Sequence, residues 1–244
     1  MRLASFFEPI SIPYKLRDVE ILVMTELQPV KNIEQGDKLL TALAGIVKAY
    51  KWLYEEMKLL HRDVSVENMM YRLGTEGNVV GVLNDFDLAI MLSEQANGPV
   101  SKQRTGTRPY MAIELLESVD GNPPLHLCRH DLESMMYAIV DLVCFRHASA
   151  EDKNDSPIAE WFLVELTTRH LANSKLAFLH QARPQQPSEH MKNLSGLVLN
   201  LRRMFRHGYN DKGNAVDYDN LDEFDHETLG GHITLNKFAG HFGL

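Results

Sequence analysis

The chain has 244 residues, 44% of them hydrophobic and 24% charged, which suits one large globular domain and excludes a wholly disordered chain. Its formal charge of −8 excludes a general polyanion binder, because phosphate backbones are bound by clustered lysine and arginine side chains. Cys128 and Cys144 are too few for a disulfide framework, so we expect an intracellular protein of the cytoplasm or nucleus. We expect no nucleic-acid partner and no membrane span, since apolar runs such as 21–24 fall far below the roughly 20 residues that a bilayer requires. The sequence does not indicate an oligomeric state.

The first part of the chain alternates between strand-like and helical patterns. Residues 19–27 are rich in branched apolar side chains and precede Pro29, which predicts a strand. A long amphipathic helix, with Asp37 as its cap, is predicted next from apolar residues at alternating steps of four and three. Further on, a turn at Gly74 and Gly77 separates two predicted strands with polar residues at their ends, the second within 79–90. The helical stripe comprises Leu39, Leu43, Ile46, Tyr50, Leu53, Met57 and Leu60.

The second part of the chain is predicted to be mainly helical. Residues 91–108 are polar and irregular, which indicates a functional loop. Residues 132–145 are apolar nearly all round and predict a buried central helix. Peripheral helices are expected around 161–171 and 191–205. The stretch 208–227 carries many Asp and Asn residues with little periodicity, so we expect a loop or a partly disordered segment there.

One loop and one strand end carry residues suited to phosphoryl transfer. This reaction needs a carboxylate beside the attacking hydroxyl and oxygen ligands that hold Mg²⁺ against the phosphates of ATP. The catalytic loop, residues 61–68 (HRDVSVEN), offers Asp63 as a base and Asn68 as a metal ligand. Asp85 opens a DFD run after an apolar strand and is the second candidate ligand. The catalytic loop followed by the DFD run at this spacing is far more specific for phosphoryl transfer than either motif alone.

Two further elements extend the pattern. Residues 106–114 (GTRPYMAIE) resemble the end of a kinase activation segment, GT-x-x-Y-x-A-P-E, with Ile113 in place of the proline. His130 and Asp131 open the buried helix, at the position from which kinases hydrogen-bond the backbone of the catalytic loop. The chain therefore resembles the protein kinase superfamily and is most similar to the fungal-type protein kinase family, over roughly residues 18–145.

The resemblance implies an α+β, protein kinase-like fold that consists mainly of the helical C-lobe with a truncated N-lobe. Residues 1–30 would be a remnant of the N-lobe strands and hinge, 31–207 the C-lobe, and 208–244 a C-terminal loop and tail. The implied activity is transfer of the ATP γ-phosphate to Ser/Thr hydroxyls of a protein substrate, with ATP and Mg²⁺ as cofactors. No Gly-rich loop or strand lysine is recognised ahead of the catalytic loop. This leaves open a catalytically inactive pseudokinase or kinase fragment that acts as a protein-interaction module.

The resemblance also assigns catalytic roles. Asp63 would be the catalytic base, Arg62 the link to the activation segment, and Ser65 a further residue of the catalytic loop. Ser65 stands where most Ser/Thr kinases carry a lysine that neutralises the transferred phosphate. Thr107 lies where Ser/Thr kinases carry a threonine near the catalytic aspartate, which favours a Ser/Thr substrate over tyrosine.

Nucleotide and metal contacts follow from the same resemblance. Asn68 and Asp85 would bind Mg²⁺, and Met70 would form part of the adenine floor. Glu26 and Leu27 would lie in the hinge whose backbone meets adenine. Asp87 replaces the glycine of the usual DFG, which removes backbone freedom and adds a charge beside the metal site.

Two groups of histidines could suggest zinc instead. His126, Cys128 and His130 lack a fourth spaced ligand. His226 and His232 do not have the i, i+4 spacing that places two histidines on one helix face. We therefore expect neither group to bind zinc.

Overall fold

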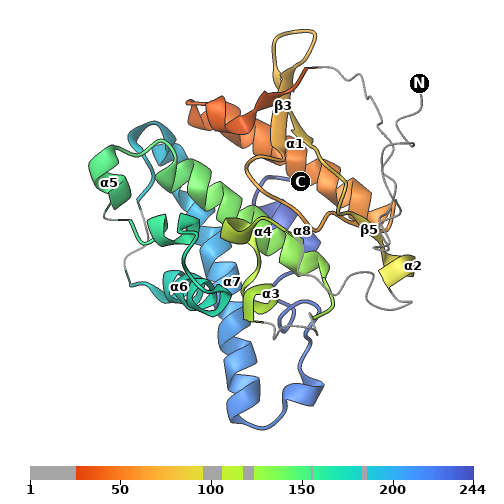
Figure 1. Ribbon diagram of the computed structural model, residues 1–244. Coiled ribbons are helices and arrows are strands. Elements are labelled where there is room, and N and C mark those ends of the chain that lie inside the picture. The colour runs from red at the N-terminus through yellow and green to blue at the C-terminus, as the bar shows by residue number, and fades with distance from the viewer. Residues whose placement is uncertain (1–25, 96–105, 118–123, 155, 183–185) are drawn as a thin grey trace, which may run out of the picture.

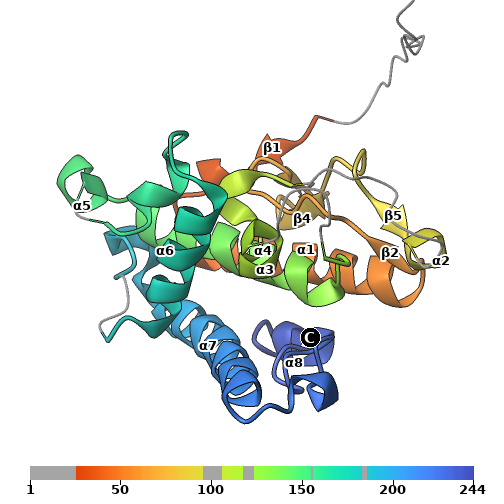
Figure 2. The same cartoon turned by 60° about the horizontal axis from the view of Figure 1, so that its bottom comes forward.

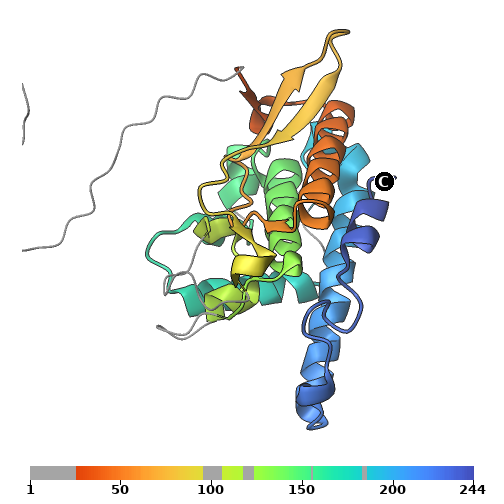
Figure 3. The ribbon, with the colours of Figure 1, turned by 90° about the vertical axis from the view of Figure 1, so that its right-hand side faces the viewer.

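The computed structural model describes residues 26–95, 106–117, 124–154, 156–182 and 186–244. Helices α1 (Gly36–Glu55), α4 (Cys128–Val140) and α7 (Ser195–Asp217) form the body of the molecule, with small antiparallel sheets at one side (Figure 1). A view turned by 90° shows these three helices running in roughly the same direction, with α1 drawn between α4 and α7 (Figure 3). The α+β prediction is confirmed. None of the described helices is long and apolar enough to cross a bilayer.

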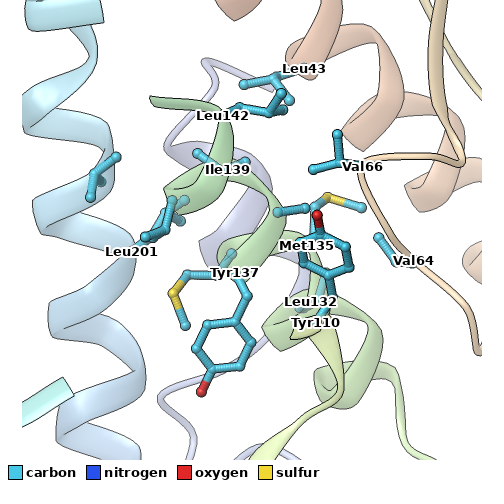
Figure 4. Packing of buried hydrophobic residues seen from close by; sticks show 14 of the residues in the cluster. Leu43, Val64, Val66, Tyr110, Leu132, Met135, Tyr137, Ile139, Leu142 and Leu201 are labelled. Carbon is cyan, nitrogen blue, oxygen red and sulfur yellow. The ribbon is translucent and has the colours of Figure 1, made fainter. Parts of the chain in front are cut away.

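Helix α4 is the centre of the core, as its apolar sequence predicts. Every residue from Arg129 to Val140 is buried, and a π-helical turn continues the helix from Asp141 to Phe145. Leu201 of α7 packs on one side of this helix, while Val64 and Val66 of the catalytic loop pack on the other (Figure 4). Burying a valine side chain contributes about 1.5–3 kcal/mol to the free energy of unfolding, so these two residues stabilise the position of the catalytic loop on the core.

A three-stranded sheet with the order β1-β3-β4 lies against α1. Strands β3 (Met69–Leu73) and β4 (Val79–Leu83) form the predicted hairpin, and β1 (Gln28–Pro29) pairs with the free edge of β3. Gly81 permits the close packing of this sheet on α1, because a Cβ atom there would lie 1.8 Å from the carbonyl oxygen of Ala42.

A second antiparallel pair brings the two candidate site loops together. Strand β2 (Leu59–Leu60) leads directly into the catalytic loop, and β5 (Ile90–Met91) follows the DFD run. Because β2 and β5 are hydrogen-bonded neighbours, the segments that carry Asp63 and Asp85 lie at the same end of the fold.

The remaining helices lie around these three. The helix predicted around 191–205 is present within η6 and α7, whereas 161–171 is helical only at its two ends, because 163–167 are not helical. Helix α6 contacts α3 and α7, and α8 contacts α1 and α4 (Figure 2). Residues 19–25 of the predicted first strand lie outside the described residues. The other elements are η2 (Val30–Asn32), α2 (Leu92–Gln95), η3 (Arg108–Tyr110), α3 (Ile113–Glu117), α5 (Ala150–Asn154), η5 (Ala159–Phe162), α6 (Thr168–His180), η6 (Glu189–Leu194), η7 (Leu221–Glu223) and α8 (Leu235–Gly240).

Three local predictions are wrong. Asp37 does not cap α1, because the helix begins at Gly36 and Asp37 lies in its first turn. Met57 and Leu60 do not extend the helical stripe, since α1 ends at Glu55, Met57 is 45% exposed and Leu60 lies in β2. The loop predicted for 208–227 is helical as far as Asp217, where α7 ends.

Tertiary contacts explain the longer α7. A Cβ atom at Gly208 would lie 2.8 Å from the side chain of Leu229, so the helix and the following segment are tightly packed there. Leu229 and Phe238 are fully buried, which makes the segment after α7 part of the core. The helix is hard to recognise in the sequence of 208–217, because the polar residues of this stretch occupy its exposed face.

Candidate active site

Asp131 of α4 holds the start of the catalytic loop. Its carboxylate accepts hydrogen bonds from the backbone N–H groups of His61, at 2.9 Å, and Arg62, at 3.0 Å. The predicted contact between Asp131 and the loop backbone is therefore present. Arg62 has a φ of 68°, a left-handed conformation that is uncommon for a residue other than glycine. Such a conformation persists where surrounding contacts determine it, and the two bonds to Asp131 provide them.

Two side chains complete the environment of Asp131. The Tyr50 hydroxyl donates to the carboxylate at 2.9 Å, and His126 Nε2 lies 2.8 Å from its other oxygen. Burial alone would raise the pKa of Asp131, but His126, His61 and these hydrogen bonds hold it below its ordinary value. Asp131 is therefore an ionised, fully hydrogen-bonded anchor beneath the catalytic loop.

Asp63 is half-buried, and its two carboxylate oxygens have different partners. Oδ1 accepts hydrogen bonds from the backbone N–H and the hydroxyl of Thr107, both at 2.8 Å. Oδ2 accepts a longer bond, 3.3 Å, from the Asn68 side-chain amide, which also donates to the Asp63 carbonyl at 2.9 Å. The loop and the activation segment thus fix the Asp63 side chain from two directions.

Gly106 lets the activation segment approach the catalytic loop closely. It has a φ of 116°, and a Cβ atom there would lie 3.2 Å from the Arg62 carbonyl oxygen. A side chain would be strained in this conformation and would also crowd the loop. Gly106 therefore allows Thr107 to reach Asp63.

The segment that carries Asp85 is tied to the same loop. The Asn84 N–H donates to the Asn68 carbonyl at 2.9 Å, and the Phe86 ring lies 4.9 Å from the His61 ring, centroid to centroid. Asp85 is exposed, has a φ of 63°, and accepts a 3.3 Å hydrogen bond from the Asp87 N–H. Asp85 and Asn68 therefore lie on directly bonded segments, which suits two ligands of one site.

The chemistry of this pair fits a hard divalent cation. Asp85 offers carboxylate oxygens, and the side-chain amide nitrogen of Asn68 is already engaged by Asp63, which leaves the amide oxygen for a metal. Carboxylate and amide oxygens are the ligands that Mg²⁺ takes from proteins.

Ser65 is buried and closes a turn. Its hydroxyl accepts the Asn68 N–H at 3.3 Å, and its carbonyl accepts the N–H groups of Asn68 and Met69 at 3.2 and 3.1 Å. The side chain thus shapes the loop around Asn68.

The residues predicted to contact the nucleotide lie on neighbouring strands. Met70 of β3 is paired with Pro29 of β1, and Glu26 and Leu27 come immediately before β1. Glu26 is exposed, whereas Leu27 and Met70 are half-buried. The fold thus places the candidate hinge beside the candidate adenine floor.

The residues that hold the end of the activation segment come from distant parts of the chain, and no sequence motif predicts their contacts. The Glu114 carboxylate contacts Arg129, His130 Nε2 at 3.3 Å and Lys212 Nζ at 2.5 Å. Burial opposes the ionised form of Glu114, but His130, Arg129 and Lys212 outweigh it and lower its pKa. Burial lowers the pKa of His130 to about 3, despite the hydrogen bond to Glu114, so the ring is neutral near pH 7. The sequence hints at these contacts only through Arg129, a charged residue in a buried helix.

Comparison with known proteins agrees with this arrangement. No curated protein matches the chain. The model of a family described as fungal protein kinase matches residues 8–143, which is more than half of the chain and includes the catalytic loop, the DFD run and the activation segment. The chain therefore belongs to the fungal protein kinase family.

Proposed function

We propose that the chain is a Ser/Thr protein kinase that transfers the γ-phosphate of ATP to a hydroxyl of a protein substrate. The observation that carries this proposal is the position of Asp63, which Thr107 and Asn68 hold from two sides at the end of the fold where Asp85 lies. Membership of a kinase family supports the general reaction.

The partners of Asp63 suggest how it acts. Oδ1 is occupied by two short hydrogen bonds from Thr107, whereas Oδ2 has the longer bond from Asn68. Oδ2 is therefore the oxygen available to accept the proton of the substrate hydroxyl. A base placed within hydrogen-bond distance of the attacking group also orients it, which is a large part of catalysis in phosphoryl transfer.

Asn68 and Asp85 are the proposed Mg²⁺ ligands, with Glu26, Leu27 and Met70 as proposed contacts of the adenine. Mg²⁺ would supply neutralisation of the charge on the phosphates. Arg62 and Ser65 would act on the geometry of the loop, Ser65 through its bond to Asn68.

The hydroxyl of Thr107 supports a Ser/Thr substrate, because it bonds to Oδ1 of Asp63, whose other oxygen, Oδ2, would receive the proton of the substrate hydroxyl. Labelled ATP should transfer its γ-phosphate to serine- and threonine-containing peptides, and acid hydrolysis of the products should give phosphoserine or phosphothreonine. Phosphotyrosine alone would contradict the substrate class. If no phosphate is transferred to any peptide or protein, the proposal that the chain is an enzyme is contradicted.

Thr107→Ala should lower kcat by about tenfold to a hundredfold, since one hydrogen bond to a carboxylate contributes about 1.5–3 kcal/mol. Thr107→Ser is the matched control and should retain most of the activity, because it keeps the hydroxyl. Steady-state kinetics of both variants tests this, and equal activity of the alanine variant and the original chain would show that the hydroxyl does not orient Asp63.

A further inference from the structure

Lys175 is a fully buried lysine that the proposed mechanism does not use. It comes from α6, and its Nζ donates to the carbonyl oxygen of Met111 in the activation segment. Nζ also lies 3.9 Å from the centroid of the Tyr137 ring. Burying an amine is costly unless it is hydrogen-bonded, and burial holds the pKa of Lys175 well below its ordinary value.

Hydrogen bonds connect Lys175 to the catalytic aspartate. Lys175 bonds to the Met111 carbonyl, and the N–H of Met111 donates to the Thr107 carbonyl at 3.2 Å. The N–H of Thr107 in turn donates to Asp63 Oδ1 at 2.8 Å. Only the short η3 turn separates Thr107 from Met111 along the chain. Displacement of Met111 would therefore be transmitted to the contact between Thr107 and Asp63.

Glu133 holds the same segment through a second hydrogen bond. Its Oε1 accepts the buried N–H of Ile113 at 2.9 Å and the hydroxyl of Tyr137 at 2.9 Å, and its Oε2 accepts the hydroxyl of Tyr209 at 2.7 Å. The proline usual at position 113 has no N–H, so isoleucine here creates a donor that needs a partner. Glu133 is that partner.

We propose that Lys175 is a positioning residue that, together with Glu133, fixes residues 111–113 and thereby sets Thr107 against Asp63. The effect on activity rests on the proposed kinase function. The contact between Lys175 and Met111 does not depend on that function, because it involves only the protein and is measurable without ATP.

Substitution by methionine separates positioning from simple stabilisation. Methionine has a similar length and no amine, so it removes the hydrogen bond to the Met111 carbonyl with little change in volume. The loss of a purely structural lysine would lower the melting temperature without changing the geometry at Asp63. The loss of a positioning lysine would change the geometry at Asp63 in the folded variant.

The test compares Lys175→Met with Lys48→Met, a control at an exposed position of α1. Hydrogen exchange of the full chain, followed by NMR well below the melting temperature of both variants, should show the Thr107 and Met111 amides exchanging at least tenfold faster in Lys175→Met. Activity should fall about tenfold in kcat with an unchanged KM for ATP. Lys175→Gln keeps an N–H donor and should lose less protection than the methionine variant.

Unchanged exchange at Thr107 and Met111 in a folded Lys175→Met variant would overturn the proposal. So would failure of that variant to fold, because Lys175 would then be a requirement for folding. If the original chain transfers no phosphate, the exchange result still decides the positioning role, and only the proposed function is lost.

Discussion

Asp63→Asn is expected to lower phosphate transfer by about 10²–10⁴-fold, the usual contribution of a positioned general base. Asparagine has the same shape and keeps an oxygen that can accept the two hydrogen bonds from Thr107. It lacks the basicity needed to accept the proton of a substrate hydroxyl. The loss should therefore appear in kcat, while the melting temperature and ATP binding remain close to those of the original chain.

Single-turnover kinetics with labelled ATP measures this effect. Asp222→Asn makes the same chemical change at an exposed position of η7 and should have full activity. Full activity of Asp63→Asn would remove Asp63 from the role of base. A large loss of melting temperature in the same variant would mean that the carboxylate is needed for folding instead.

Asp131→Ala should cause the largest loss of stability, about 3–5 kcal/mol in the free energy of unfolding, as expected for breaking a buried charged network. The substitution leaves the N–H groups of His61 and Arg62 and the hydroxyl of Tyr50 without their acceptor in the core. Domains of this kind have about 5–15 kcal/mol of stability in all, so the variant would be close to unfolding. Urea denaturation followed by circular dichroism measures the difference.

Asp131→Asn is the matched variant, because it keeps one acceptor oxygen and should lose less stability than alanine. Below the melting temperature, folded Asp131→Ala should still lose activity, since nothing then holds Arg62 in its left-handed conformation. A stability loss under about 0.5 kcal/mol, the range of ordinary surface substitutions, would contradict the assignment of Asp131 as the anchor of the loop.

The sequence predicts those parts of the fold and the site that local patterns encode. The catalytic loop, the DFD run and Asp131 each lie in short runs that resemble those of kinases, and this resemblance implies that they lie close together. The hairpin of β3 and β4 and the buried helix α4 follow from apolar periodicity and from the glycines between the strands.

The missed features depend on contacts between segments far apart in the chain. Lys175 and Met111 are 64 positions apart, and a lysine in a helix of mixed composition is normally expected on the surface. Glu133 is visible as a charge in an apolar helix, but its role depends on the N–H of Ile113. The extension of α7 depends on Leu229, which no periodicity within 208–217 reveals.

Calorimetric titration of the chain with ATP, in the presence and absence of Mg²⁺, tests the central claim most directly. The account predicts Mg²⁺-dependent binding that Asp63→Asn retains and Asp85→Ala abolishes, because Asp85 would supply the principal carboxylate to the metal. Absence of binding by the folded chain, or equal binding by Asp85→Ala, would contradict the proposed nucleotide site and favour a role in protein interaction alone.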